Sequence, residues 1–256
     1  MKVAILLPYK ENFSKYSAGA VSIFVNDTNN LSKFKNYIKV FGSTSSNSNL
    51  NNYTNIELKK NILTSTSSQY LKNFTRIILN EQIEILEIHN RPHYINNLDK
   101  ILDCKKVLYF HNDPLKMQGS ISIKDRINLL KKTDKIIFNS YWSRSRYLIG
   151  LPKDTNINNI NVIHQSTSKT KIDFTKKKKT ISFVGKLNSS KGYDIFGKAI
   201  LKILNKYKDW NSIVIGDEPR EKFFFEHKRL NHLGFKNNSY ILRKLKNVSI
   251  SVVPSK

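Results

Sequence analysis

Short apolar runs alternate with amphipathic stretches along most of the chain. The runs have the length and composition of buried strands, and the stretches between them repeat apolar residues at the three-and-four spacing of a helix. Residues 21–31 show this helical spacing, and residues 70–78 show it again. Strands and helices in alternation are typical of α/β proteins with parallel sheets. In the first series, strands are predicted at residues 2–7, 38–41, 85–89, 107–110, 135–138 and 161–163.

The pattern lapses between residues 165 and 179, which are rich in Ser, Thr and Lys. We therefore predict a Rossmann-like N-terminal domain over residues 1–168, a linker over 169–179 and a Rossmann-like C-terminal domain over 180–256. Doubly wound sheets usually have about five or six strands, so the fewer strands of the second series predict an incomplete second domain. That series has predicted strands at 180–184, 212–215 and 248–253, and helices at 193–207 and 239–246.

The most informative segment is the loop that joins the strand at 180–184 to the helix that follows. Gly185 and Gly192 permit close backbone approach or a positive φ, and the helix points its free N–H groups and the positive end of its dipole at the loop. Lys186 and Lys191 add two ammonium charges. The segment matches neither the P-loop nor the dinucleotide fingerprint. It is either an anion-binding site or a plain strand-to-helix connection with solvated lysines.

Polar residues follow most of the predicted strands. In open α/β sheets ligands bind beyond the carboxyl ends of the strands, so these residues are candidates for a binding site. The alternatives are structural: a glycine at a strand-to-helix turn, an ordinary acidic turn at 216–219, and a helix N-cap at Ser140. The candidates are Lys10, Gly19, His89, Asn90, His111, Asn112, Asn139, Ser140, Gly216 and Asp217.

His111 is the most interesting of the six histidines. It ends an apolar strand and has Asn112 and Asp113 beside it, so its imidazole can face a cleft. It is either a ligand contact or a residue that shapes the turn. His89 and His93 flank a predicted turn at Pro92, and His93 is predicted to lie in a loop. The spacing of the histidines does not resemble that of a zinc site. We therefore predict no metal held by the protein and no other cofactor.

The composition is that of a globular protein, with 39% hydrophobic residues among 256. No apolar run approaches the roughly 18 residues of a membrane span, and the apolar stretch at the N-terminus is too short for a signal peptide. The single cysteine, Cys104, excludes an internal disulfide, which favours a reducing compartment. We expect a cytoplasmic protein.

The chain carries a net charge of +25, from 44 basic and 19 acidic residues. Three explanations are open. Lysine is abundant everywhere, so the charge can be a solvated surface; it can also favour peripheral contact with anionic lipid at the inner face of the membrane, or binding to nucleic acid. The chain lacks a recognisable nucleic-acid reading module, so we expect no nucleic-acid partner.

Several segments, taken in order, resemble the retaining glycosyltransferases of the GT-B fold, in the large family 4. The likeness spans nearly the whole chain, and the order and spacing of the segments carry it. Residues 251–255 resemble the strand that leads into the family's acidic donor motif. The other matching segments are residues 17–20, 87–92, 109–113, 134–142, 183–192 and 214–217.

The resemblance implies a nucleotide-sugar donor that is held mainly by the second of two Rossmann-like domains. Lys186, in place of the family's usual arginine, and Lys191 would neutralise the diphosphate as it leaves. Gly19 would offer its backbone near the donor phosphates. His111 would be the catalytic residue, in contact with the donor sugar. The donor-binding residues implied are Gly19, Gly185, Lys186, Lys191, Gly216 and Asp217.

The implied enzyme transfers a hexose or related sugar to a lipid-linked or polysaccharide acceptor, with retention of configuration and without a metal, as in lipopolysaccharide or exopolysaccharide synthesis. Ala18 replaces the first glycine of the family's usual pair. The family's two donor-site glutamates would follow residue 255, so we expect the chain to be the amino-terminal part of such an enzyme. The alternative is a non-catalytic relative that binds nucleotide weakly or not at all.

Overall fold

The structure is a computed structural model that describes residues 2–14, 19–44, 52–58, 65–166, 171–218 and 221–255. The chain divides into two compact units, Met1–Thr167 and Ser168–Lys256. Each unit is built on a parallel sheet, as the alternation of strands and helices predicts. The predicted α/β class is therefore confirmed for both units.

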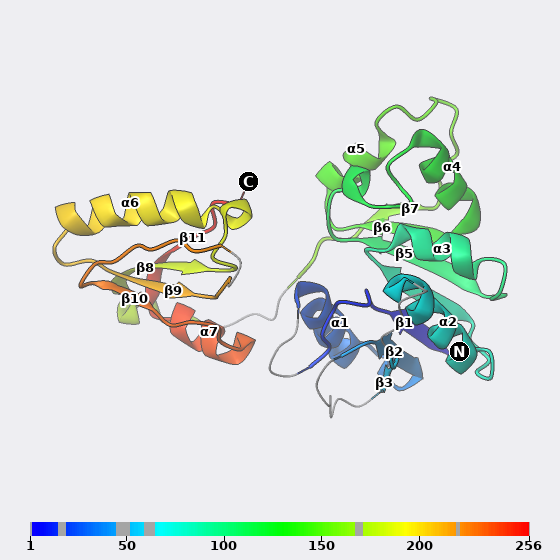
Figure 1. The fold of residues 1–256 in the computed structure, drawn as a ribbon, viewed down its shortest axis with the longest axis horizontal. Helices are drawn as coiled ribbons and strands as arrows, with labels where there is room; N and C mark the ends of the chain where they lie inside the picture. Colours follow the sequence, from blue (N-terminus) through cyan, green and yellow to red (C-terminus); the bar gives the residue numbers. More distant parts are fainter. Residues whose placement is uncertain are drawn as a thin grey trace. The chain divides into compact units, whose positions relative to one another are not determined.

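Seven parallel strands form the sheet of the first unit among the residues that the structure describes (Figure 1). They are β1 (Val3–Leu6), β2 (Ile38–Gly42), β3 (Tyr53–Asn55), β4 (Ile85–His89), β5 (Lys105–Phe110), β6 (Lys135–Phe138) and β7 (Ile160–Val162). Their order across the sheet is β3-β2-β1-β4-β5-β6-β7. The strand order reverses between β1 and β4, so this pair is the switch point at which open α/β sheets bind ligands.

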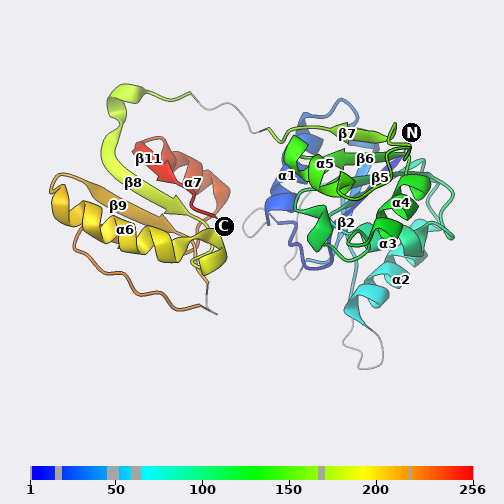
Figure 2. The same ribbon diagram turned by 90° about the horizontal axis from the view of Figure 1, so that it is seen from above.

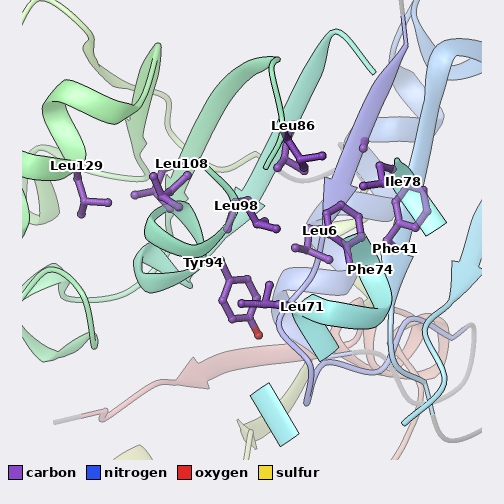
Figure 3. Packing of buried hydrophobic residues seen from close by; sticks show 14 of the residues in the cluster. Leu6, Phe41, Leu71, Phe74, Ile78, Leu86, Tyr94, Leu98, Leu108 and Leu129 are labelled. Carbon is purple, nitrogen blue, oxygen red and sulfur yellow. The ribbon is translucent and has the colours of Figure 1, made fainter. Parts of the chain in front are cut away.

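Helices cover both faces of this sheet. They are α1 (Ala20–Leu31), α2 (Thr66–Ile78), α3 (Pro92–Leu98), α4 (Ile123–Lys132) and α5 (Tyr141–Leu148). Leu6, Leu86 and Leu108 lie on one face and form the main core with side chains from α2, α3, α4 and α5 (Figure 3). Val21 and Val25 of α1 pack on the opposite face, against the residues of β1 and β2 that alternate with those of the main core.

The second unit contains a smaller parallel sheet, with four strands in its described residues. They are β8 (Lys178–Val184), β9 (Asn211–Ile215), β10 (Leu230–His232) and β11 (Val248–Val252). Their order is β10-β9-β8-β11, so the order reverses between β8 and β11. Helix α6 (Tyr193–Lys206) covers one face and α7 (Asn238–Leu245) the other (Figure 1, Figure 2). Right-handed crossovers on opposite sides of β8 require this arrangement.

The hydrophobic pattern does not predict every helix and strand of the structure. Strand β3 lies in a segment that the pattern assigns to a loop; it is a short edge strand of polar sequence. Helix α4 and strand β10 are likewise not predicted. The prediction that His93 lies in a loop is wrong, because Pro92 begins α3, and proline is favoured in the first turn of a helix.

The second unit begins earlier than the end of the predicted linker. Strand β8 starts at Lys178, where it pairs with Val248 of β11, so residues 178 and 179 belong to the sheet. Just before it, Phe174–Lys176 forms a short 3-10 helix. Among the described residues of both units, no helix is long and apolar enough to cross a membrane.

Candidate functional site

Polar side chains gather at the carboxyl end of the first sheet. Glu87 and His89 lie two residues apart on β4, so their side chains point to the same face. The neighbouring strand β5 places Tyr109 opposite His89 and leads directly into His111. The His89 residue is fully buried, with 0% of its surface exposed. Two adjacent strands therefore bring two histidines and a carboxylate together.

Three hydrogen bonds join these side chains in a row. His89 Nε2 lies 2.7 Å from Glu87 Oε1, and His89 Nδ1 lies 2.8 Å from His111 Nε2. At the outer end, Gln165 Nε2 lies 2.5 Å from His111 Nδ1. We name Glu87, His89 and His111 the histidine relay.

The chemistry of the groups fixes the direction of each hydrogen bond in the histidine relay. A carboxylate has no proton to give, so His89 Nε2–H donates to Glu87. At the outer end, the amide nitrogen of Gln165 can only donate, so His111 Nδ1 accepts. A neutral His111 then carries its proton on Nε2, which donates to His89 Nδ1. The outer nitrogen of His111 thus presents a lone pair and not a proton.

Aromatic rings enclose the two imidazoles. Tyr109 stacks on both, with its ring centroid 5.4 Å from that of His89 and 4.7 Å from that of His111. Phe24 of α1 meets His111 edge-on at 5.1 Å. Burial, with a smaller contribution from His89, lowers the pKa of His111 from 6.5 to about 3. Burial and then Glu87 raise the pKa of Tyr109 to about 12. His111 is therefore neutral near pH 7, as the histidine relay requires.

Two of the predicted asparagines hold the backbone of His111. Asn90 is buried, with a φ of 52°, and its Oδ1 accepts the N–H of His111 at 2.8 Å. Asn139 Nδ2 donates to the His111 carbonyl at 2.8 Å. Ser140 accepts the N–H of Ser143 at 3.2 Å, which confirms it as the N-cap of α5. Both asparagines therefore support the site, whereas Ser140 has a structural role.

Lys10 and Asn112 have exposed side chains. Lys10 Nζ lies 5.3 Å from the ring centroid of Tyr9. Lys10 also lines a cavity of about 560 Å³ at the carboxyl ends of β1, β2 and β3. Asn112 does not line this cavity. The polar residues of that cavity are Lys10, Asn12, Ser43, Thr44, Asn55 and Glu57.

Gly19 is the N-cap of α1, and a carboxylate lies against it. Glu11 Oε1 accepts the N–H of Ser22, in the first turn of the helix, at 3.1 Å. A Cβ atom at position 19 would come within 2.1 Å of the same oxygen. Ser17 and Ala18 of the predicted glycine turn lie outside the described residues. An acidic side chain therefore occupies the helix N-terminus at which the resemblance implies a phosphate.

Glycines allow close backbone contacts at the carboxyl end of the second sheet. Gly192 has a φ of 70°, and a Cβ atom there would lie 2.1 Å from the carbonyl oxygen of Pro254, just beyond β11. A Cβ atom at Gly216 would lie 1.8 Å from the carbonyl oxygen of Gly185. Side chains at either position would push these strand ends apart. The predicted need for glycine in the loop is therefore confirmed at Gly192.

The turn at residues 188–192, which we name the anion turn, binds a carboxylate. Glu221 Oε2 accepts from the Ser189 N–H at 2.9 Å and from the Ser189 hydroxyl at 3.0 Å. Asn188 Oδ1 shapes the turn by accepting the Lys191 N–H at 3.0 Å. Phosphate oxygens use the same kinds of donor as carboxylate oxygens. The Ser189 donors are therefore suited to an anionic ligand.

The charged residues predicted for the donor site, Lys186, Lys191 and Asp217, are all exposed. None of the ion pairs among the described residues involves either of these lysines. The Asp217 carbonyl accepts the N–H of Leu187 at 3.3 Å, which ties the loop after β9 to the loop after β8. Both ammonium groups are therefore open to solvent and outside the ion pairs of the described residues.

Sequence reasoning missed Glu87, Gln165 and Glu221 as site residues. Glu87 carries a signal, because it lies two residues before His89 on a strand and so shares its face. Gln165 and Glu221 carry none, because their contacts join residues 54 and 32 positions apart.

A metal site would need several suitable side chains close together. In the part of the chain that the structure describes, no group of three or more His, Cys, Asp or Glu residues could hold a metal ion. That the reaction needs no protein-held metal stays a prediction.

Comparisons with known proteins bear on this geometry. No family model matches the sequence, and no curated protein matches it. Among solved structures, sucrose-phosphate synthase from Thermosynechococcus elongatus is 12% identical with a TM-score of 0.71, and the match covers 100% of this chain and 76% of that one. HepE of Anabaena, in complex with UDP and glucose, is 14% identical with a TM-score of 0.67, over 100% of this chain and 74% of that one. WaaG, a glycosyltransferase involved in lipopolysaccharide biosynthesis, is 10% identical with a TM-score of 0.63, over 98% and 75%.

At these identities the likeness shows the fold alone. The fold is that of GT-B glycosyltransferases, with a seven-stranded sheet in the first described unit and four described strands of the second domain. The predicted GT-B architecture with a partial second domain is therefore confirmed. Membership of family 4 stays a prediction.

Proposed function

We propose that the protein is a glycosyltransferase that takes its sugar from a nucleotide-sugar donor. The anion turn carries this proposal, since Ser189 binds a carboxylate through its N–H and hydroxyl while Lys186 and Lys191 lie exposed on the same loop. The turn lies at the β8 and β11 switch point, where ligands bind in sheets of this kind. The similarly folded HepE was solved with UDP and glucose, which supports a nucleoside diphosphate as the ligand.

The residues of the anion turn suit the chemistry of such a donor. Departure of a nucleoside diphosphate builds negative charge on its phosphate oxygens. The ammonium groups of Lys186 and Lys191 and the Ser189 N–H stabilise that charge, and they do so more in the transition state than in the ground state. Lysine supplies a point charge here without the bidentate geometry of the arginine usual in family 4. We assign no protein nucleophile, in keeping with retention of configuration in that family.

The cavity at the ends of β1, β2 and β3 supports a glycan as the acceptor. Amide and hydroxyl groups of Asn12, Ser43, Thr44 and Asn55 line it, together with the ammonium of Lys10. Sugar hydroxyls donate and accept hydrogen bonds, so they suit such a mixed lining. An acceptor in lipopolysaccharide or exopolysaccharide synthesis is our proposal, since WaaG and the galactosyltransferase WaaB share the fold. Contact with anionic membrane stays a prediction.

Calorimetric titration with UDP tests the donor site. Replacing Lys186→Ala together with Lys191→Ala should weaken UDP binding about 100-fold, because two charge-assisted contacts to phosphate are lost at about tenfold each. The matched control is Lys198→Ala with Lys202→Ala on α6, which removes the same charge from exposed positions away from the anion turn. It should change UDP affinity by less than about threefold.

Two results would count against the proposal. Equal weakening in both double variants would mean that UDP senses only the net charge, and no UDP binding by the wild type would contradict a nucleotide site altogether. A wild type that binds UDP but releases none from a panel of UDP-sugars in the presence of glycan acceptors would favour the non-catalytic alternative.

A further inference from the structure

Two cavities lie at the amino ends of the strands of the first sheet, opposite the end that carries the histidine relay. One cavity, of about 330 Å³, lies where β1, β2 and β3 begin. The other, of about 310 Å³, lies where β4 and β5 begin. Glu81 and Ile83 line both cavities, and β1 and β4 are neighbours in the sheet, so the two cavities adjoin. We name them together the amino-end site.

We propose that the amino-end site binds a neutral oligosaccharide. The site belongs to the first unit alone, and it lies at the end of the sheet opposite to that at which open α/β sheets bind their substrates. The choice of a glycan rests on the proposed function, because the acceptor and the product of a glycosyltransferase are glycans. A glycan held at this site stays near the cavity that Lys10 lines in the same unit, which raises the effective concentration of the acceptor there.

Aromatic rings give the larger cavity an apolar surface. Tyr37, which is 54% exposed, lines it together with Phe41 and Tyr53. The ring of Tyr53 is held in place, because it stacks on Phe13 with 5.1 Å between the centroids and its hydroxyl lies 2.7 Å from Thr44 Oγ1. The face of a pyranose ring that carries C–H groups is apolar, so covering an exposed aromatic ring with it removes apolar surface from water. The ring of Tyr37 is therefore suited to stack on a sugar.

Polar groups of the same cavity both donate and accept hydrogen bonds. Lys39 Nζ lies 2.5 Å from Glu81 Oε1. An ammonium has three donors and a carboxylate has two oxygens, so this ion pair can bind further hydroxyl groups. Asn36 and Asn52 add two amides, and Asn52 Nδ2 donates to the Lys35 carbonyl at 3.1 Å, which orients its amide group. Each sugar hydroxyl donates and accepts, so this mixed lining suits a sugar.

The charges of the amino-end site favour a neutral ligand. Among the described residues, the charged side chains that line it are Lys2, Lys39, Glu81 and Asp103, so positive and negative charges balance. A phosphate or nucleotide would face the carboxylates of Glu81 and Asp103, and such like-charge contacts are unfavourable. A hydrocarbon chain would cover the ion pair and the amides without forming hydrogen bonds to them, which is also costly. A ligand with hydroxyl groups and apolar faces avoids both penalties.

Saturation-transfer difference NMR of the full chain with maltohexaose, cellohexaose and mannohexaose tests the site. We expect at least one of these neutral hexasaccharides to bind in the absence of nucleotide. Tyr37→Ala should weaken this binding about tenfold, because the stacked ring is lost. The matched control is Phe34→Ala, which removes a similarly exposed ring from the same segment but outside the cavity, and should change the affinity by less than about twofold.

Lys10→Ala distinguishes the amino-end site from the cavity at the carboxyl ends of β1, β2 and β3. It should leave hexasaccharide binding unchanged. If none of the three hexasaccharides binds, or if Tyr37→Ala binds as tightly as the wild type, the inference is overturned. Loss of binding in Lys10→Ala alone would place the glycan in the other cavity and overturn it as well. If the wild type binds no UDP, the proposed function fails, whereas the hexasaccharide titrations still decide whether this site binds a glycan.

Discussion

The histidine relay of the first unit and the anion turn of the second unit differ in burial, in charge and in the groups that form their hydrogen bonds. The histidine relay is neutral at its outer end, partly or fully buried, and fixed by a row of hydrogen bonds. The anion turn relies on exposed ammonium groups and on backbone and hydroxyl donors. One site presents a lone pair of fixed orientation, and the other presents positive charge.

This difference predicts which substitutions each site tolerates. In the buried histidine relay, the loss of a neutral hydrogen-bond partner is costly, because no water replaces it. At the exposed anion turn, each charge contributes less, because solvent screens it. The anion turn therefore depends on several groups together, whereas the histidine relay depends on the order of its members.

The largest expected effect is a loss of stability at Gly192, where the anion turn depends on backbone packing and not on charge. Gly192→Ala should destabilise the second unit by about 3 kcal/mol or more, because a Cβ atom would meet the Pro254 carbonyl at 2.1 Å in a backbone of positive φ. Gly234 is the matched control, since it has a φ of 67° and nothing within 4 Å of a Cβ atom. Gly234→Ala should cost only about 1 kcal/mol.

Urea unfolding followed by the fluorescence of Trp210 measures this difference. Trp210 lies in the second unit, so a Trp142→Phe background removes the signal of the first unit. Equal costs for the two alanine variants would show that the approach of Pro254 to the anion turn does not constrain the second unit.

The second effect is the pH dependence of the free energy of unfolding that comes from His111 of the histidine relay. The pKa of His111 is about 3 in the folded protein and 6.5 in the ordinary state, so below pH 6.5 the unfolded chain binds a proton that the folded chain does not. The free energy of unfolding should therefore decrease as the pH falls from 6.5 toward 3, by about 1 kcal/mol per pH unit from this group. Above pH 6.5 the contribution is complete and constant.

Urea unfolding of the wild type and of His111→Gln at several pH values between about 4 and 7.5 isolates this contribution. Glutamine can still donate to His89 but does not titrate, so its curve should fall less steeply with decreasing pH. Parallel curves for the two proteins would mean that other groups cause the loss of stability in acid.

The smallest expected effect is a change in UDP affinity when the carboxylate of Glu221 at the anion turn is removed. Glu221→Gln should raise UDP affinity about threefold, because the carboxylate no longer competes with phosphate for the Ser189 donors. Glu226→Gln removes an equal charge from an exposed side chain of the same segment. Titration calorimetry should show a smaller change in UDP affinity for Glu226→Gln. An equal gain in UDP affinity in both variants would mean that only the net charge of the protein matters.

Most of the fold could be predicted from the sequence, because buried strands and amphipathic helices leave periodic patterns. Strands β4 and β9 and helix α5 with its Ser140 cap lie close to where the pattern places them. Strand β3 could not be found in this way. It is three residues long and polar, and its strand geometry comes from pairing with Val40–Gly42 at the edge of the sheet.

The sequence by itself determined the α/β class, the loop with Gly185 and Gly192, and the placement of His89 and His111 at the ends of two predicted strands, whereas the structure made these strands neighbours in the sheet. These features depend on local spacing, which a single chain displays. Only the tertiary structure decided that His89 joins Glu87 to His111, that Gln165 closes the row, and that Glu221 reaches Ser189. The physical reason is that hydrogen-bond direction and burial arise from contacts between distant segments, and no local pattern encodes them.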